Sequence, residues 1–387
     1  MVNTYAWLFL FPEKMRASGD SNMLYRKENN TKRISSLELL RIVLMLIIVT
    51  GHYVSQSEFI YNLNFLELYI LKVIGSAARI AVNTFLILGC YFMVISDVTP
   101  RRIMRLYWNM WMITFPVTMF AFFAGYDVGY KNLLFSALPF MGNILWFASS
   151  YLCLMLLSPW LKKVLELRKN EMKHILVILF IVIPVWHTMH CAGSASYNWL
   201  ECLGWFVFVY LSVGYYRFYV EEKINYDKWL VLFIGVVGYC LLFVISDIMH
   251  SHVTGRIAMR FLVDFRTIPN FGISAMVFYF FSRLNIGYCR FINDLAKGAF
   301  SVYIYHQVPA IIPIIWDKLW ILFFVDKALP EYFMKYSVFT IVLTYIAGCL
   351  YYKVYVVFFE NRILSSFVNY QMEKRLSLLC GMKMSHE

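Results

Sequence analysis

Charged residues are scarce in this sequence. Lys, Arg, Asp and Glu make up 15% of its 387 residues, whereas about a quarter of the residues in a soluble globular domain are charged. Hydrophobic residues make up 61% of the chain. This composition excludes an ordinary soluble globular domain and favours a protein that lies within a lipid bilayer.

The sequence also lacks the usual motifs for binding a metal or a nucleotide phosphate. Its eight cysteines are scattered, mostly inside apolar runs, with no Cys-x-x-Cys pair and no His/Cys spacing that suits zinc. There is no Gly-rich phosphate loop, no internal repeat and no low-complexity tract. We therefore expect no metal site and no permanently bound cofactor.

Long apolar runs recur along almost the whole chain. A run of roughly 20 residues crosses the hydrocarbon core of a bilayer. The sequence predicts an all-α, polytopic integral membrane protein with about ten transmembrane helices, in one domain over 33–362, between a polar lead-in at 1–32 and a tail at 363–387. The expected spans are residues 37–56, 79–96, 106–125, 144–161, 173–190, 201–219, 229–248, 268–283, 299–325 and 335–359.

Basic residues between these spans predict the orientation. Lys and Arg concentrate in alternate loops, most clearly in RRIMR (101–105) and KKVLELRKNEMK (162–173). Because cytoplasmic loops carry the excess of positive charge, we expect both termini in the cytoplasm and the chain in the cell membrane. The net charge of +12 then needs no nucleic acid as a partner, since anionic lipid headgroups suffice.

The apolar run RIVLMLIIVTGH begins with Arg41 and ends with His52. Eleven helical steps make three turns plus about 20°, with a rise of about 16 Å, so both side chains lie on one helix face. Ionisable residues within spans usually face the protein interior or a wet cavity. The alternative is that Arg41 reaches the cytoplasmic headgroups and His52 lies at the outer interface.

The run SSLELLRIVLMLIIVTGHY resembles the first membrane segment of acyltransferase family 3, whose hallmark is an Arg and a His separated by ten residues, here Arg41 and His52. NTFLILGCYFMV followed by RRIMRLYW resembles the second span and the Arg-x-x-Arg loop, here Arg102 and Arg105. GNILWFASSYLCLMLLSPWL and GAFSVYIYHQVP, which contains His306, resemble two later spans.

Two positions depart from the family pattern. Glu38 stands where the family commonly has Asp, which changes the length of the side chain and not its charge. Leu88-Gly89 stands where the family commonly has Ser-Gly, so a hydroxyl role there is in doubt. The resemblance covers roughly residues 33 to 310, and Glu38 and His306 are further candidate site residues.

The resemblance implies a bacterial membrane enzyme that moves an acyl group from acetyl-coenzyme A, or another acyl-coenzyme A, to a hydroxyl of a surface polysaccharide or glycolipid. His52 suits the general base; a covalent acyl-histidine is the open alternative. Arg102 and Arg105 would bind the donor's phosphates, with Arg41 guiding the pantetheine end or polarising the thioester. The alternative is that RRIMR is an ordinary basic cytoplasmic loop, in which Arg102 and Arg105 bind no donor.

Other features have simpler explanations. His306 is expected as a buried histidine satisfied by Tyr303 or Gln307, and Trp146 and Pro159 as packing and kink residues. The default for six charged or histidine residues in one outside loop is a solvated loop, with a saccharide site or a misplaced boundary as alternatives. These six are His250, His252, Arg256, Arg260, Asp264 and Arg266.

A competing function comes from another class of protein. A transporter or a flippase of lipid-linked sugar would also place Arg41 and His52 inside a membrane, as a substrate or proton site. The sequence shows no paired halves and no broken-helix signal of the kind that repeated transporter folds carry. We therefore prefer the acyltransferase.

Overall fold

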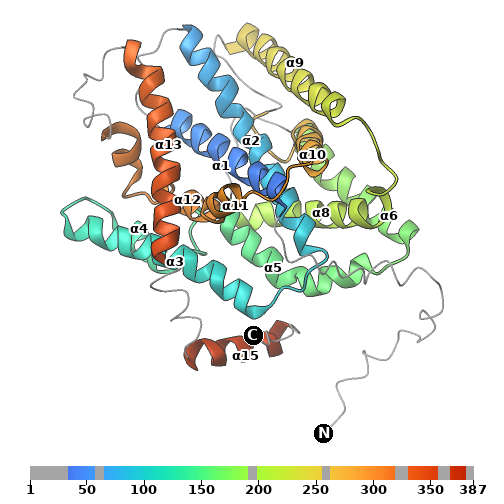
Figure 1. The fold of residues 1–387 in the computed structure, drawn as a ribbon, viewed down its shortest axis with the longest axis horizontal. Coiled ribbons are helices and arrows are strands. Elements are labelled where there is room, and N and C mark those ends of the chain that lie inside the picture. Colours follow the sequence, from blue (N-terminus) through green and yellow to red (C-terminus); the bar gives the residue numbers. More distant parts are fainter. Residues whose placement is uncertain are drawn as a thin grey trace.

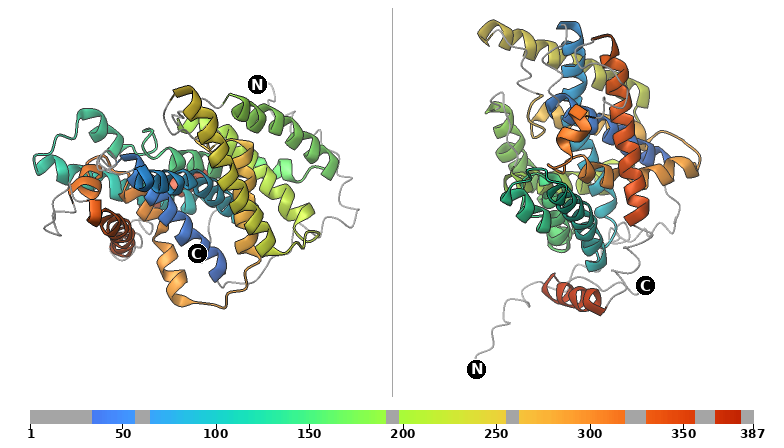
Figure 2. Two further views of the ribbon diagram at one scale, coloured as in Figure 1. Left: turned by 90° about the horizontal axis from the view of Figure 1, so that it is seen from above. Right: turned by 90° about the vertical axis from the view of Figure 1, so that its left-hand side faces the viewer.

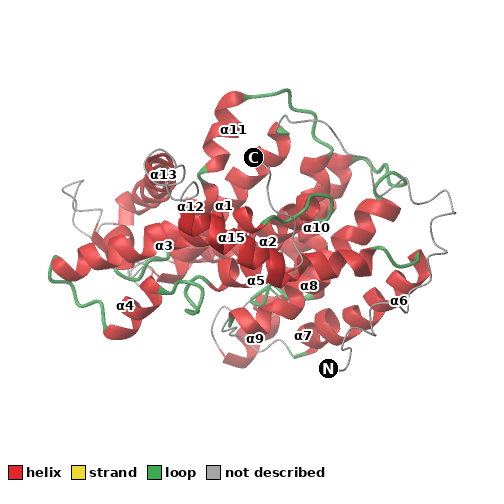
Figure 3. Ribbon diagram, turned by 90° about the horizontal axis from the view of Figure 1, so that it is seen from below, coloured by secondary structure: helices red, strands yellow, loops and turns green. Residues whose placement is uncertain are grey.

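The computed structural model describes residues 34–56, 65–190, 198–254, 262–318, 330–355 and 367–380. These residues form helices joined by loops, and no strand occurs among them (Figure 3). The α-helices are α1 (Ser35–Gln56), α2 (Phe65–Met93), α3 (Pro100–Phe123), α4 (Tyr130–Ala137), α5 (Trp146–Leu165), α6 (Lys169–Phe180), α7 (Trp186–Met189), α8 (Trp199–Tyr215), α9 (Lys228–Thr254), α10 (Ile268–Ser282), α11 (Arg290–Lys297), α12 (Ala299–Tyr305), α13 (Pro330–Tyr355) and α15 (Phe367–Cys380). Three π-helical turns are η5 (Ile181–Val185), η6 (Tyr216–Val220) and η7 (Ile314–Lys318).

The described residues include six helices that are long and apolar enough to cross a membrane, so the all-helical, membrane-integral prediction is confirmed. They are Ser35–Gln56, Tyr69–Met93, Pro100–Phe123, Lys169–Met189, Lys228–Ser246 and Tyr336–Tyr355.

The expected count of about ten spans is not confirmed. α5 carries Lys162, Lys163 and several serines, α8 has 17 residues, α10 has 15 and α12 has only seven. Part of the predicted span 299–325 lies outside the described residues. Helices that are surrounded by protein can be shorter or more polar than those facing lipid, provided that their backbone groups are hydrogen-bonded.

α1 and α2 form the centre of the bundle. α1 contacts α2, α10, α11, α12 and α13, and α2 also contacts α8 and α10. α5 packs on α8, α9 packs on α10, and α3 contacts α4, α5 and α12 (Figure 1). α15 lies below the other helices in Figure 1 and in the right-hand view of Figure 2, and it contacts α3 and α5.

α1 and α2 approach most closely where small residues face each other. A Cβ added at Gly51 would meet the Cβ of Ala78 at 2.4 Å and the carbonyl oxygen of Gly75 at 3.2 Å. A Cβ added at Gly75 would meet Val54 at 3.1 Å. Small residues let two membrane helices approach at the distance of their backbones, and here they fix the part of α1 that carries His52.

A double-mutant cycle tests this contact. We expect Gly51→Ala to lower the free energy of unfolding by about 1–3 kcal/mol, because the added methyl overpacks the interface. Ala78→Gly removes the facing methyl, so the double variant should be more stable than the sum of the two single changes. Thermal unfolding of the purified protein in detergent measures all three. Strict additivity would contradict the close approach.

Candidate functional site

His52 lines a cavity of about 250 Å³ between α1, α2, α5 and α12, which we call the His52 pocket. Its walls combine aromatic rings with a few polar side chains. They include Gly51, His52, Ser55, Gln56, Gly75, Ala78, Arg79, Phe85, Trp146, Phe147, Phe300, Tyr303 and Gln307. Mostly apolar walls with a few convergent polar groups are typical of small-molecule sites.

Arg41 lines a second and larger cavity, of about 670 Å³, which we call the arginine pocket. Two further guanidinium groups line it, together with the rings of three aromatic residues. The lining includes Glu38, Arg41, Gly89, Tyr91, Phe92, Ser96, Arg102, Tyr151 and Arg217. Arg41 and Arg102 are therefore brought to one cavity, and the structure adds Arg217 to them.

A third cavity, the middle pocket, adjoins the other two and measures about 250 Å³. It shares Phe85, Phe147 and Phe300 with the His52 pocket. With the arginine pocket it shares Arg41, Gly89 and Tyr151. The three cavities therefore follow α1 from Arg41 to His52, a rise of about 16 Å along the helix.

The ring of His306 lies beside the ring of His52, with their centroids 5.2 Å apart. His306 is fully buried, and its Nδ1 lies 2.6 Å from the carbonyl oxygen of Val302. A carbonyl only accepts, so Nδ1 carries the proton and a neutral ring keeps its lone pair on Nε2. Nε2 has no hydrogen-bond partner among the described residues. The expected hydrogen bond from Tyr303 or Gln307 to His306 is therefore absent there.

Two further residues of the His52 pocket were not assigned to a site from the sequence. Arg79 lies inside the membrane span Tyr69–Met93, and an ionisable residue within a span is a signal for function. Gln307 is 6% exposed, and its Nε2 makes no hydrogen bond with any described residue. Both bring N–H donors to the cavity that contains His52.

Of the two arginines of the Arg-x-x-Arg loop, only Arg102 lines the arginine pocket. Its Nη1 donates to the hydroxyl of Ser96 at 3.1 Å and to the carbonyl of Asp97 at 3.2 Å. Arg105 is exposed and lines none of the three cavities. Arg41 is held by Glu38 through an ion pair of 2.7 Å, which explains why a carboxylate precedes the arginine by one helical turn.

Comparison with known proteins decides the family. A model of acyltransferase family 3, described as an acyltransferase domain, matches residues 34–352. The chain belongs to this family. No curated protein and no solved structure matches it.

In this acyltransferase, the stretches that resemble the family meet around the three cavities. Arg41 and His52 come from α1, Tyr91 from α2, Arg102 from α3, and Phe147 from α5. Trp146, expected as a packing residue, lines the His52 pocket and also stacks on Phe265. Within the described ranges, no three His, Cys, Asp or Glu side chains gather closely enough to hold a metal ion.

The expected solvated loop is wrong for Asp264 and Arg266 of this acyltransferase. They are 7% and 9% exposed and form an ion pair of 2.9 Å, with a second hydrogen bond from Arg266 Nε. The Asn83 amide donates to the Phe265 carbonyl, and the Trp205 indole donates to Asn83 at 2.9 Å. These bonds hold the loop inside the bundle. The side chains of His250, His252, Arg256 and Arg260 lie outside what the structure describes.

Breaking this buried pair should destabilise the protein. We expect Asp264→Ala to lower the free energy of unfolding by about 3–5 kcal/mol, because Arg266 would keep its charge without its carboxylate partner. Asp264→Ala combined with Arg266→Met should lower it less than the single change, because no buried charge is left unpaired. Thermal unfolding measures both. An equal loss in both variants would contradict this account, because it would show that the unpaired charge of Arg266 does not cause the loss.

Proposed function

We propose that this acyltransferase moves an acetyl group from cytosolic acetyl-coenzyme A to a hydroxyl of an envelope polysaccharide or glycolipid. The reaction takes place in the His52 pocket, and His52 is the general base. The protein spans the cell membrane with both termini in the cytoplasm, so the arginine pocket opens toward the side that holds the donor.

One observation carries this proposal. Arg41 and His52 lie in cavities that share walls through the middle pocket, along one helix. The arginine end suits an anionic carrier, because guanidinium binds phosphate through paired hydrogen bonds. The histidine end suits proton transfer, because a neutral imidazole has one unprotonated nitrogen that can accept a proton. A carrier whose anionic head and reactive thioester are joined by a long neutral arm fits this separation.

His52 takes the proton of the acceptor hydroxyl as that oxygen attacks the acyl carbon. The new bond joins the acceptor oxygen to the acyl carbon, and the bond from that carbon to sulfur breaks. The electron pair leaves with the thiolate of coenzyme A, which receives the proton held on His52. Positioned general bases contribute about 10²–10⁴ in rate, and no other energy source is needed because a thioester is already activated.

His306 positions His52 in this proposal. The lone pair on His306 Nε2, left by the bond from Nδ1 to Val302, can accept an N–H from the neighbouring ring of His52. The structure holds the two rings side by side without this bond; when it forms, it would fix the tautomer of His52 and leave the other ring nitrogen unprotonated, as a general base requires. The burial of His306 and the 5.2 Å between the centroids of the two rings support this assignment.

Arg79 and Gln307 are the proposed donors to the oxygen of the tetrahedral intermediate. Acyl transfer places negative charge on this oxygen, and N–H groups aimed at it lower the barrier. Both side chains line the His52 pocket. The unused amide nitrogen of Gln307 supports its part in this role, because a buried N–H group without a partner is rare in stable proteins.

At the other end, Arg41 guides the pantetheine arm and Arg102 binds a donor phosphate. Glu38 orients Arg41 through the ion pair between them. Arg105 stays a predicted phosphate ligand. It has less support than Arg102, because it does not line the arginine pocket. The transporter or flippase alternative gains no support from any feature of the described residues.

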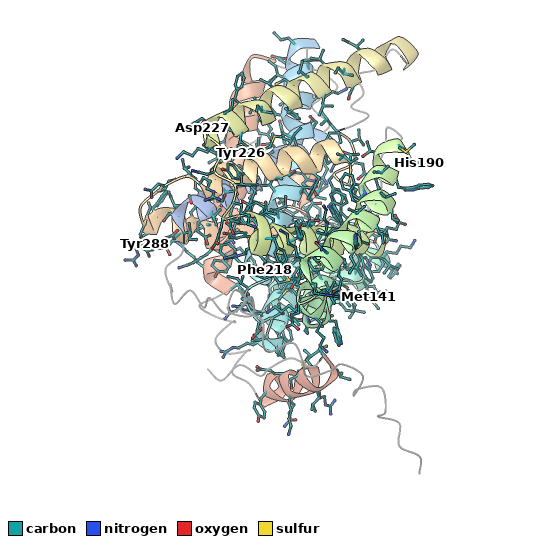
Figure 4. All side chains as sticks on the ribbon, turned by 90° about the vertical axis from the view of Figure 1, so that its right-hand side faces the viewer. Met141, His190, Phe218, Tyr226, Asp227 and Tyr288 are labelled. Carbon is teal, nitrogen blue, oxygen red and sulfur yellow. The ribbon has the colours of Figure 1, made fainter. Side chains whose placement is uncertain are left out.

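The first test uses cells that lack this protein and carry the intact chain, His52→Ala or His190→Ala at equal membrane abundance. His190 is a matched control, since it is exposed and lies at the edge of the bundle (Figure 4). We expect the intact chain and His190→Ala to restore O-acyl groups on envelope polysaccharide, and His52→Ala to reduce their formation about 10²-fold or more. Mass spectrometry of the polysaccharide measures the groups and their mass.

Unchanged acylation in the His52→Ala cells would contradict the proposed base. If acylation is the same in all strains while the amount of exported polysaccharide varies, the transporter alternative replaces the acyltransferase proposal. A mass increment other than acetyl would correct the acyl group and leave the reaction class in place.

A further inference from the structure

Arg217 completes a set of three arginines around the arginine pocket. Arg41 comes from α1, Arg102 from α3 and Arg217 from η6, so three separate elements each bring one guanidinium group to a cavity of about 670 Å³. Under the predicted orientation, all three lie toward the cytoplasmic side. Arg217 lies near the cytoplasmic end of the predicted span 201–219 and faces the cavity together with Arg41 and Arg102.

The charges of this cavity do not balance. Arg41 is paired with the carboxylate of Glu38. Arg102 donates to a hydroxyl and a backbone carbonyl, and Arg217 donates to the backbone carbonyl of Tyr91. No ion pair between either of these two arginines and a carboxylate occurs among the described residues. The cavity therefore offers two guanidinium charges to an anion.

Arg217 is held in place before any ligand binds. Its Cζ lies 3.8 Å from the centre of the Tyr91 ring, and the Tyr91 hydroxyl donates to Glu221 at 2.7 Å. A guanidinium that stacks on a ring keeps its N–H edge for an acceptor in its plane. The π-helical turn that contains Arg217 is a feature that occurs frequently at functional sites.

We propose that Arg217 binds a phosphate of the nucleotide half of the acyl donor and so determines that the donor must carry a nucleotide. This inference rests on the proposed function, in which the donor is an acyl-coenzyme A. The pantetheine arm is neutral and would not need three arginines. The nucleotide half carries a pyrophosphate and a 3′-phosphate, and its adenine can stack on rings such as Phe92 and Tyr151, which line the same cavity.

The test compares two donors, acetyl-coenzyme A and acetyl-pantetheine, which lacks the nucleotide. Their dissociation constants are measured on the purified full chain in lipid nanodiscs, for the intact protein, Arg217→Gln, Arg217→Lys and the control Arg168→Gln. Arg168 is a matched control, because it is exposed, pairs with Glu171 at 2.6 Å and lines none of the three cavities.

We expect Arg217→Gln to weaken acetyl-coenzyme A binding by about 10- to 100-fold, the range for a lost hydrogen bond between charged groups. Its affinity for acetyl-pantetheine should equal that of the intact protein, which also shows that the variant is folded. The affinity of Arg217→Lys for acetyl-coenzyme A should lie between those of the intact protein and Arg217→Gln, since lysine keeps the charge but loses the planar stack. Arg168→Gln should behave as the intact protein.

Two outcomes would overturn the inference while leaving the proposed function in place. In one, the intact protein prefers acetyl-coenzyme A and Arg217→Gln binds it equally well. In the other, Arg217→Gln loses both donors to the same extent, which would make Arg217 a structural residue. If the intact protein binds neither donor, the proposed function fails, and the inference about Arg217 fails with it.

Discussion

The site depends on the close approach of α1 and α2. Gly51, Gly75 and Ala78 let the two backbones meet, and the same three residues line the His52 pocket. His52 follows Gly51 directly on α1, and Arg79 follows Ala78 directly on α2. A larger side chain at this contact would therefore separate His52 from the residues around it as well as loosen the bundle.

Among the described residues, polar groups inside the bundle are of two kinds, those that are hydrogen-bonded to one another and those that have no partner. Asn83, Trp205 and the backbone of Phe265 satisfy one another, as buried groups in a membrane domain must. Gln307 Nε2, in the pocket that contains His52, is left without a partner within the described ranges. An unpaired buried group is costly, and in the proposed reaction the oxygen of the tetrahedral intermediate would recover that cost.

The sequence could predict α1 and the helix face that carries Arg41 and His52, because one helix places both residues by its own periodicity. It could not place Arg217 beside Arg102, since that neighbourhood depends on packing between distant segments. Nor could it show that Asp264 and Arg266 are buried. Their charges indicated a solvent-exposed loop, whereas the ion pair between them allows both side chains to be buried. The expected count of about ten spans is not confirmed among the described residues, because helices enclosed by others can be shorter or more polar than lipid-facing ones.

The most direct test of transfer along α1 is to close the junction between the arginine pocket and the middle pocket. A Cβ at Gly89 would lie 2.9 Å from the Tyr151 hydroxyl, whereas one at Gly238 meets nothing within 4 Å. The measurement is acetyl transfer by purified Gly89→Val, compared with the control Gly238→Val. We expect Gly89→Val to lose transfer to a much greater extent than it weakens coenzyme A binding, because the arginines of the arginine pocket are kept, while Gly238→Val keeps both. Full transfer by Gly89→Val would contradict a route along α1.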